Sequence, residues 1–139
     1  MEGLALSALR PHPHFDDRST LDWHSDWRTA LRAAREQNKL VFVEFGREQC
    51  SQCRALVQSV VPRPEIAALL RAGFVALAAD CDAPEPEVEE LAMQVPDASM
   101  LPFVMFADAD GRYLEGSSGA VHPRLFEATL KRLREPASG

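Results

Sequence analysis

The sequence has few cysteines, no long apolar run and no surplus of positive charge, and each shortage excludes a class of protein. Three cysteines in 139 residues are too few, and odd in number, for a small secreted fold held together by disulfides. No apolar run approaches the roughly 20 residues that a membrane-spanning helix requires. The net charge of −6 argues against nucleic acid as a partner, because phosphate binding needs a clustered positive face.

What the sequence does contain is typical of an ordinary globular domain. Hydrophobic residues make up 46% of the chain and charged residues 26%, and a chain of this length typically buries roughly two-thirds of its unfolded surface. The beginning, Met1-Glu2-Gly3, has no basic stretch ahead of an apolar one. We therefore expect no signal peptide and a cytoplasmic monomer, or a periplasmic protein if a leader has been removed.

The first 21 residues show no sustained hydrophobic period and contain two prolines and two histidines. This pattern predicts an extended N-terminal arm over residues 1–21, ahead of a domain over residues 22–139. Two histidines in such an arm are more often solvated than bound to a metal ion, so we expect His12 and His14 to be solvated.

Hydrophobic periodicity predicts alternating helices and strands in the rest of the chain. The predicted helices cover residues 26–38, 50–60, 65–71 and 85–93, and a last one starts at Pro123. The predicted strands cover residues 40–45, 74–79 and 103–107, and a turn at 108–111 leads to a hairpin strand over 112–115. The inner side of the last helix is expected to carry four apolar residues, Leu125, Phe126, Leu130 and Leu133.

Helices between the first strands imply parallel pairing, and the final hairpin adds antiparallel strands. We therefore predict an α/β fold with a mixed central sheet between layers of helices. In such sheets the reactive groups lie at the carboxyl ends of the parallel strands. Cys50 and Cys53 follow the first predicted strand, and Cys81 follows the second.

The pair Cys50-Ser51-Gln52-Cys53 carries the strongest chemical signal. Two cysteines with this spacing at the start of a helix can close a small disulfide, and the first sulfur then faces backbone N–H groups that favour its thiolate. The second sulfur lies one turn inside the helix, where it can attack a mixed disulfide on the first. We predict that Cys50 is the nucleophile and Cys53 the resolving thiol of a thiol–disulfide exchange.

Two other uses of cysteine are less well supported by the sequence. A zinc site needs two further ligands, and only Cys81 is at hand, without a second cysteine pair. A cysteine protease needs a histidine base, but neither His24 nor His122 stands at a recognisable spacing. We therefore expect no metal site and no protease.

Several features occur together between residues 23 and 134. The apolar strand Val-Phe-Val-Glu-Phe precedes the cysteine pair, Leu101-Pro102 precedes the third strand, and Asp110-Gly111 and Gly119 follow it. This combination resembles the thioredoxin superfamily, and in particular its longer single-domain members similar to disulfide reductases and isomerases. The resemblance implies a thioredoxin-like three-layer α/β/α sandwich.

The resemblance also implies roles for three residues outside the pair. Glu44 matches a buried carboxylate that manages the proton of the resolving cysteine. Pro102 matches a cis-proline that presents its backbone to a substrate segment, and Leu101 lines the apolar docking surface. Electrons pass through the dithiol itself, so no bound cofactor is implied.

Three departures from the family pattern concern the redox properties. Classical members of the family have an aromatic residue before the first cysteine, and this chain has Gln49 there. They have Gly-Pro between the two cysteines, and this chain has Ser51-Gln52. The lysine that often pairs with the buried acid in this family is absent, and Ala76 or Ala78 occupies its position. The sequence therefore leaves open whether the protein reduces, oxidises or isomerises disulfides.

Cys81 has two interpretations. It follows the second strand, on the same sheet edge as Cys50. The simpler interpretation is a small core residue. The alternative is a third redox-active thiol that traps or relays a disulfide.

We predict a thiol–disulfide oxidoreductase that exchanges disulfides with protein substrates and needs a separate reductase or redox partner. One alternative is a non-catalytic thioredoxin-like adaptor or chaperone that binds partners near Pro102. Another is a metal-handling protein that uses Cys50, Cys53 and Cys81. The cysteine pair favours the oxidoreductase, because an adaptor has no need of both thiols.

Overall fold

The computed structural model describes residues 9–135. Residues 1–8 of the predicted arm and residues 136–139 lie outside that range. The elements along the described chain are β1 (Trp23–His24), α1 (Trp27–Gln37), β2 (Leu40–Gly46), α2 (Ser51–Ala55), the π-helical turn η2 (Leu56–Val60), α3 (Pro64–Gly73), β3 (Phe74–Asp80), α4 (Pro86–Ala92), β4 (Phe103–Ala107), β5 (Tyr113–Ser118) and α5 (Pro123–Arg134). None of the helices in this range is long and apolar enough to cross a membrane.

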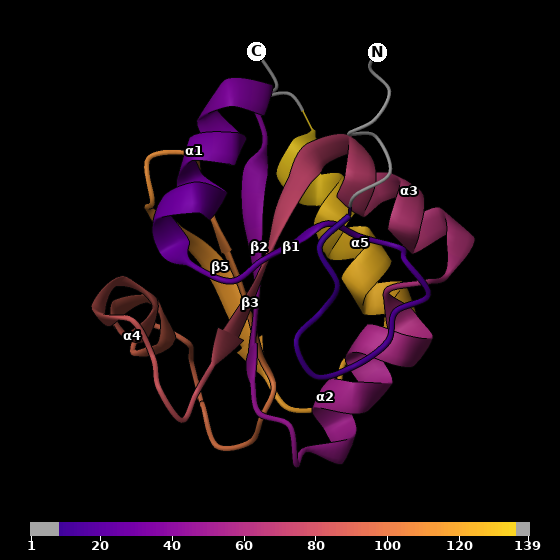
Figure 1. The fold of residues 1–139 in the computed structure, drawn as a ribbon, viewed down its shortest axis with the longest axis vertical. Helices are drawn as coiled ribbons and strands as arrows, with labels where there is room; N and C mark the ends of the chain where they lie inside the picture. Colours follow the sequence, from indigo (N-terminus) through magenta and orange to yellow (C-terminus); the bar gives the residue numbers. More distant parts are fainter. Residues whose placement is uncertain (1–8, 136–139) are drawn as a thin grey trace.

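The five strands form one mixed sheet in the order β1-β3-β2-β4-β5 (Figure 1). β1, β3 and β2 run parallel to one another, because helical connections carry the chain back between them. β4 runs antiparallel to β2, and β5 forms a hairpin with β4. The predicted mixed sheet is therefore confirmed.

Helices cover both faces of this sheet (Figure 1). α1 and α4 pack on one face, against a core that includes Val41 and Val43 of β2. α2, η2, α3 and α5 cover the other face, against a core that includes Phe42. Successive strand residues point to opposite faces, so Glu44 shares the Phe42 face. This arrangement confirms the predicted α/β/α sandwich.

Most predicted elements are confirmed, with shifts at their ends. Asp26 caps α1, since its side chain accepts a hydrogen bond from the backbone N–H of Thr29. The predicted helix that follows Cys50 changes to a π-helical turn at Leu56. The two-residue strand β1 was not predicted, because two residues are too few to show a period.

The prediction for the inner side of α5 is wrong at one position. Phe126 and Leu130 are buried, but Leu125 is 68% exposed. Phe126, Leu130 and the partly buried Leu133 are four and three residues apart, which places them on one face of the helix. Leu125 lies about 100° around the helix from Phe126, and this rotation turns it towards solvent.

The N-terminal segment over residues 9–22 contains no helix or strand, yet it packs on the domain. Phe15 and Leu21 belong to the core on the α2 and α3 side of the sheet. The buried carboxylate of Asp17 accepts hydrogen bonds from the Trp23 indole at 2.9 Å and from the backbone N–H of Leu21 at 3.0 Å. The described part of the predicted arm is therefore held against the sheet by apolar burial and by hydrogen bonds.

Candidate functional site

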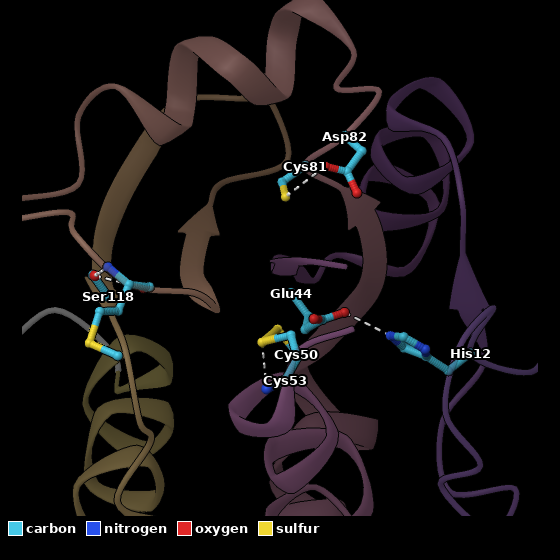
Figure 2. Close-up of a disulfide and its surroundings, with 8 residues drawn as sticks. His12, Glu44, Cys50, Cys53, Cys81, Asp82 and Ser118 are labelled. Atoms are coloured by element: carbon cyan, nitrogen blue, oxygen red, sulfur yellow. Dashed lines mark hydrogen bonds and ion pairs between the residues drawn. A yellow bond between two sulfur atoms is a disulfide. The ribbon is translucent and has the colours of Figure 1, made fainter. Parts of the chain in front are cut away.

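Cys50 and Cys53 form a disulfide at the carboxyl end of β2, where α2 begins (Figure 2). Their Cα atoms are 5.2 Å apart, within the range that a disulfide requires. Cys50 is the N-cap of α2 and is partly exposed, whereas Cys53 is fully buried. The first sulfur is therefore the more accessible of the two.

The backbone favours negative charge on the first sulfur. The N–H of Cys53 donates a hydrogen bond to Cys50 Sγ at 3.1 Å. A hydrogen bond to a charged form stabilises that form, and the aligned peptide dipoles of the helix act in the same direction. When the disulfide is reduced, this N–H is already placed to stabilise a Cys50 thiolate.

Glu44 lies beside Cys53 and is only 2% exposed, so the expectation of a buried carboxyl group is confirmed. Gly46 makes room for it beside Cys53. A Cβ atom added to Gly46 would lie 2.5 Å from Cys53 Sγ and 2.6 Å from Glu44 Oε2. Both atoms therefore border the same small space. Cys53 Sγ and Glu44 Oε2 are no more than about 5 Å apart.

His12 is the partner of Glu44, and the prediction that it is solvated is wrong. Its Nε2 lies 2.7 Å from Glu44 Oε1 (Figure 2). The ring is buried against Trp23. Ala78 pairs with Glu44 across the sheet. Its methyl side chain, with that of Ala76, leaves space on this face, which the N-terminal segment fills. The structure thus places a histidine beside the acid whose usual lysine partner is missing.

Sequence reasoning missed His12 as a site residue because 32 positions separate it from Glu44, and no local period connects them. One signal was present. An acid inside an apolar strand needs a hydrogen-bonding partner, and neither alanine at the expected lysine position supplies one. A wider search for a donor reaches His12 and His14, but only the tertiary structure distinguishes them.

The segment before β4 is tied to the end of β5. The Leu101–Pro102 peptide bond is cis, and Leu101 is partly buried between the two cores. Ser118 Oγ accepts a hydrogen bond from the backbone N–H of Met100 at 3.0 Å and donates one to its carbonyl oxygen at 2.8 Å. The N–H of Gly119 donates to the carbonyl oxygen of Pro102. Residues 100–102 are therefore held in place by main-chain and hydroxyl contacts.

Cys81 lies on the predicted sheet edge, since its N–H donates to the carbonyl oxygen of Gly46 at 2.8 Å. It is half-buried, and Figure 2 shows its sulfur beside Asp82 and apart from the disulfide. Burial raises the pKa of the Cys81 thiol, the Arg47 guanidinium partly opposes this, and the Asp82 carboxylate adds to it. The thiol form is thus favoured over the thiolate.

The three cysteines are not gathered into a metal-binding cluster. Within residues 9–135, only Asp80, Cys81 and Asp82 bring three possible ligand atoms within 4.8 Å of one another. Both carboxylates are exposed, which is common for acidic residues that bind no ion. Cys50 and Cys53 do not belong to this group, so the geometry does not support a metal site built from all three cysteines.

Comparison with known families gives one match. A family model for thioredoxin-like proteins matches residues 22–109, which include the cysteine pair and all strands except β5. No curated protein matches the sequence.

Solved structures of similar proteins share the fold at low identity. A thioredoxin from Thermus thermophilus is 24% identical with a TM-score of 0.66, over 82% of this chain and 87% of the other. A putative disulphide-isomerase from Bacteroides thetaiotaomicron is 23% identical with a TM-score of 0.64, over 84% and 94% of the two chains. A disulphide isomerase from Xylella fastidiosa Temecula1 is 20% identical with a TM-score of 0.60, over 78% and 88%. At these identities the likeness shows the fold alone.

Proposed function

This chain belongs to the thioredoxin-like family, and from that premise we propose that it is a thiol–disulfide oxidoreductase that acts on protein disulfides through Cys50 and Cys53. The observation that carries the proposal is the unequal setting of the two sulfurs. Cys50 caps the helix at a partly exposed position with a backbone N–H on its sulfur, and Cys53 is fully buried. A reachable first sulfur and a shielded second one suit attack followed by internal resolution.

The exchange proceeds in two balanced steps. The Cys50 thiolate attacks one sulfur of a substrate disulfide, which forms a mixed disulfide and releases the first substrate thiolate. Cys53 then loses its proton and attacks Cys50 Sγ, which closes the protein disulfide and releases the second substrate thiolate. The substrate gains two electrons and the protein loses two. A separate reductase restores the dithiol, and the reverse sequence oxidises a substrate dithiol.

Three neighbouring residues have supporting roles in this proposal. Glu44 takes up the proton that Cys53 loses, because its carboxyl group is buried beside that sulfur. Leu101 and Pro102 offer an apolar surface and a fixed backbone to an extended substrate segment. Their position is supported by the hydrogen bonds that Ser118 and Gly119 make to this segment.

The test is a titration of the purified protein in defined glutathione buffers, with each thiol trapped and located by mass spectrometry. We expect a two-electron transition confined to Cys50 and Cys53, with a midpoint between about −270 mV for reducing thioredoxins and about −120 mV for strong oxidants. Cys53→Ser is expected to accumulate a mixed disulfide on Cys50, and Cys50→Ser is not.

Two other outcomes carry information. If Cys81 is oxidised in the same transition, its role as a third redox thiol gains support. If Cys50 and Cys53 never pair, the oxidoreductase proposal is wrong. Partner binding that survives in the Cys50→Ser, Cys53→Ser double variant then indicates the adaptor function.

A further inference from the structure

His12 has both ring nitrogens engaged. The backbone N–H groups of His14 and Phe15 point at Nδ1 from 3.0 and 3.2 Å, and Nε2 lies 2.7 Å from Glu44 Oε1. Because two N–H donors face Nδ1, that nitrogen must carry a lone pair and no proton. The neutral ring therefore carries its proton on Nε2 and donates it to Oε1.

Packing keeps the ring in this orientation. The Phe15 ring stacks on His12 with centroids 5.4 Å apart, and the Trp23 ring lies nearly perpendicular to it with centroids 4.7 Å apart. The side chains of His12 and Glu44 are 1% and 3% exposed. Phe15 and Trp23 belong to the core, so the imidazole cannot turn without disturbing buried neighbours.

The two oxygens of Glu44 consequently face different partners. Oε1 accepts from His12, and Oε2 lies with Cys53 Sγ around the space beside Gly46. An oxygen that already accepts a hydrogen bond from an N–H group is a weaker proton acceptor than one that does not, so Oε2 is the better acceptor of the two. The free lone pairs of Glu44 are thus turned towards the resolving thiol.

We propose that His12 is a positioning residue for disulfide exchange, whose Nε2–H holds Oε1 of Glu44 so that Oε2 takes the proton of Cys53. The inference rests on the proposed function. In the resolving step the Cys53 S–H bond breaks and an O–H bond forms at Oε2. The Cys53 sulfur joins Cys50, and the departing substrate sulfur keeps the electron pair of the broken S–S bond. His12 keeps its own proton throughout.

A cleft of about 210 Å³ offers the proton a route to solvent. Its lining reaches from the buried His12 and Glu44 to exposed Asp80 at the end of β3 and exposed Ala83 in the loop that follows. The titratable groups that face the pair from this cleft are the side chains of His14, Asp80 and Glu85. On the side of the disulfide, Cys53 itself is the titratable neighbour.

The test follows the two steps separately, in full-length chains that carry Cys81→Ser. One equivalent of dithiobis(nitrobenzoate) releases one thionitrobenzoate when Cys50 attacks it and a second when Cys53 closes the disulfide. In His12→Phe we expect an unchanged first phase. The second phase should be slowed roughly tenfold near neutral pH. This is less than the roughly hundredfold or more by which a positioned acid or base typically accelerates a reaction. The difference should shrink in alkaline solution, where Cys53 ionises without help.

Two matched variants accompany His12→Phe. His12→Gln keeps an N–H donor near the place of Nε2 and should restore most of the second-phase rate. Asp16→Asn changes an exposed residue of the same segment that does not line the cleft, so it should leave both phases unchanged. If the second phase is equally fast at every pH in His12→Phe and in the chain that keeps His12, the inference is wrong and the proposed function stands. An unaltered protein without a second phase would instead overturn the proposed function.

A measurement on the unaltered protein covers the case in which His12→Phe does not fold. Nitrogen-15 couplings to the ring protons report which nitrogen of His12 carries the proton. We expect a proton on Nε2 and none on Nδ1, in both the oxidised and the reduced protein at neutral pH. A proton on Nδ1 would contradict the proposed geometry, whatever the variants do.

Discussion

Gly46 lies so close to Cys53 that a side chain at this position would overlap the buried sulfur. A Cβ atom added there would lie 2.5 Å from Cys53 Sγ and 3.4 Å from Cys53 Cβ. The end of β2 and the start of α2 approach each other at this point, and a glycine is what allows their contact. The sequence offers no sign of this requirement, because a glycine after a strand is also an ordinary turn residue.

Gly46→Ala is expected to destabilise the oxidised protein. The added methyl group meets a sulfur that the disulfide prevents from moving aside, and overpacking of this kind typically costs about 1–3 kcal/mol in the free energy of unfolding. Gly73→Ala is the matched control. Its Cβ meets the flexible side chain of Arg134, which can move, so the loss should be much smaller. Urea unfolding compares the two, and equal losses would contradict the prediction.

Ser118→Ala is expected to lower kcat/KM for the reduction of insulin disulfides. Ser118 Oγ binds the backbone of Met100 on both its N–H and carbonyl sides, and its removal frees the segment that leads into Pro102. We expect a loss of roughly threefold to tenfold, less than the roughly hundredfold that a 1 Å misplacement can cost. Ser117→Ala, at an exposed neighbouring position, should change nothing. An equal loss in both variants would argue against a positioning role for Ser118.

Cys81 is expected to react slowly with iodoacetamide at neutral pH and faster as the pH rises. Only the thiolate reacts, and burial raises the pKa of this thiol. Arg47 lowers that pKa and Asp82 raises it. Asp82→Asn should therefore speed alkylation at neutral pH, and Arg47→Gln should slow it. The rates are measured by mass spectrometry in chains with serine at positions 50 and 53. Changes of the same sign in both variants would refute this electrostatic account.

Asp17→Ala is expected to loosen the N-terminal segment and to lower the free energy of unfolding by about 2–4 kcal/mol, because buried donors lose their acceptor. Those donors are the Trp23 indole and the backbone N–H groups of Thr20 and Leu21. Asp16→Ala is the control, since within residues 9–135 the exposed Asp16 accepts only from the N–H of Arg18. Its cost should stay below about 1 kcal/mol. Urea unfolding measures both, and similar costs would show that the buried contacts contribute little.

Local patterns in the sequence were sufficient for most of the architecture. The apolar run of β2 and the three- to four-residue spacing of α1 are short-range features, and their elements form where predicted. The cysteine pair is also local, since three positions bring the two sulfurs together at the start of a helix. Exposed Leu125 shows the limit of such patterns. An apolar residue next to a buried stripe cannot be told from a member of that stripe by its residue type alone.

The amino-acid sequence by itself determined four of the five strands, the helices and the cysteine pair, because each depends on hydrophobic period or on neighbours within one helical turn. The surroundings of the disulfide were decided only by the tertiary structure. His12 reaches Glu44 across 32 positions, because the small side chains of Ala76 and Ala78 leave space on that face of the sheet. The sequence indicates that Glu44 needs a partner, but which residue supplies it depends on how the chain fills volume in three dimensions.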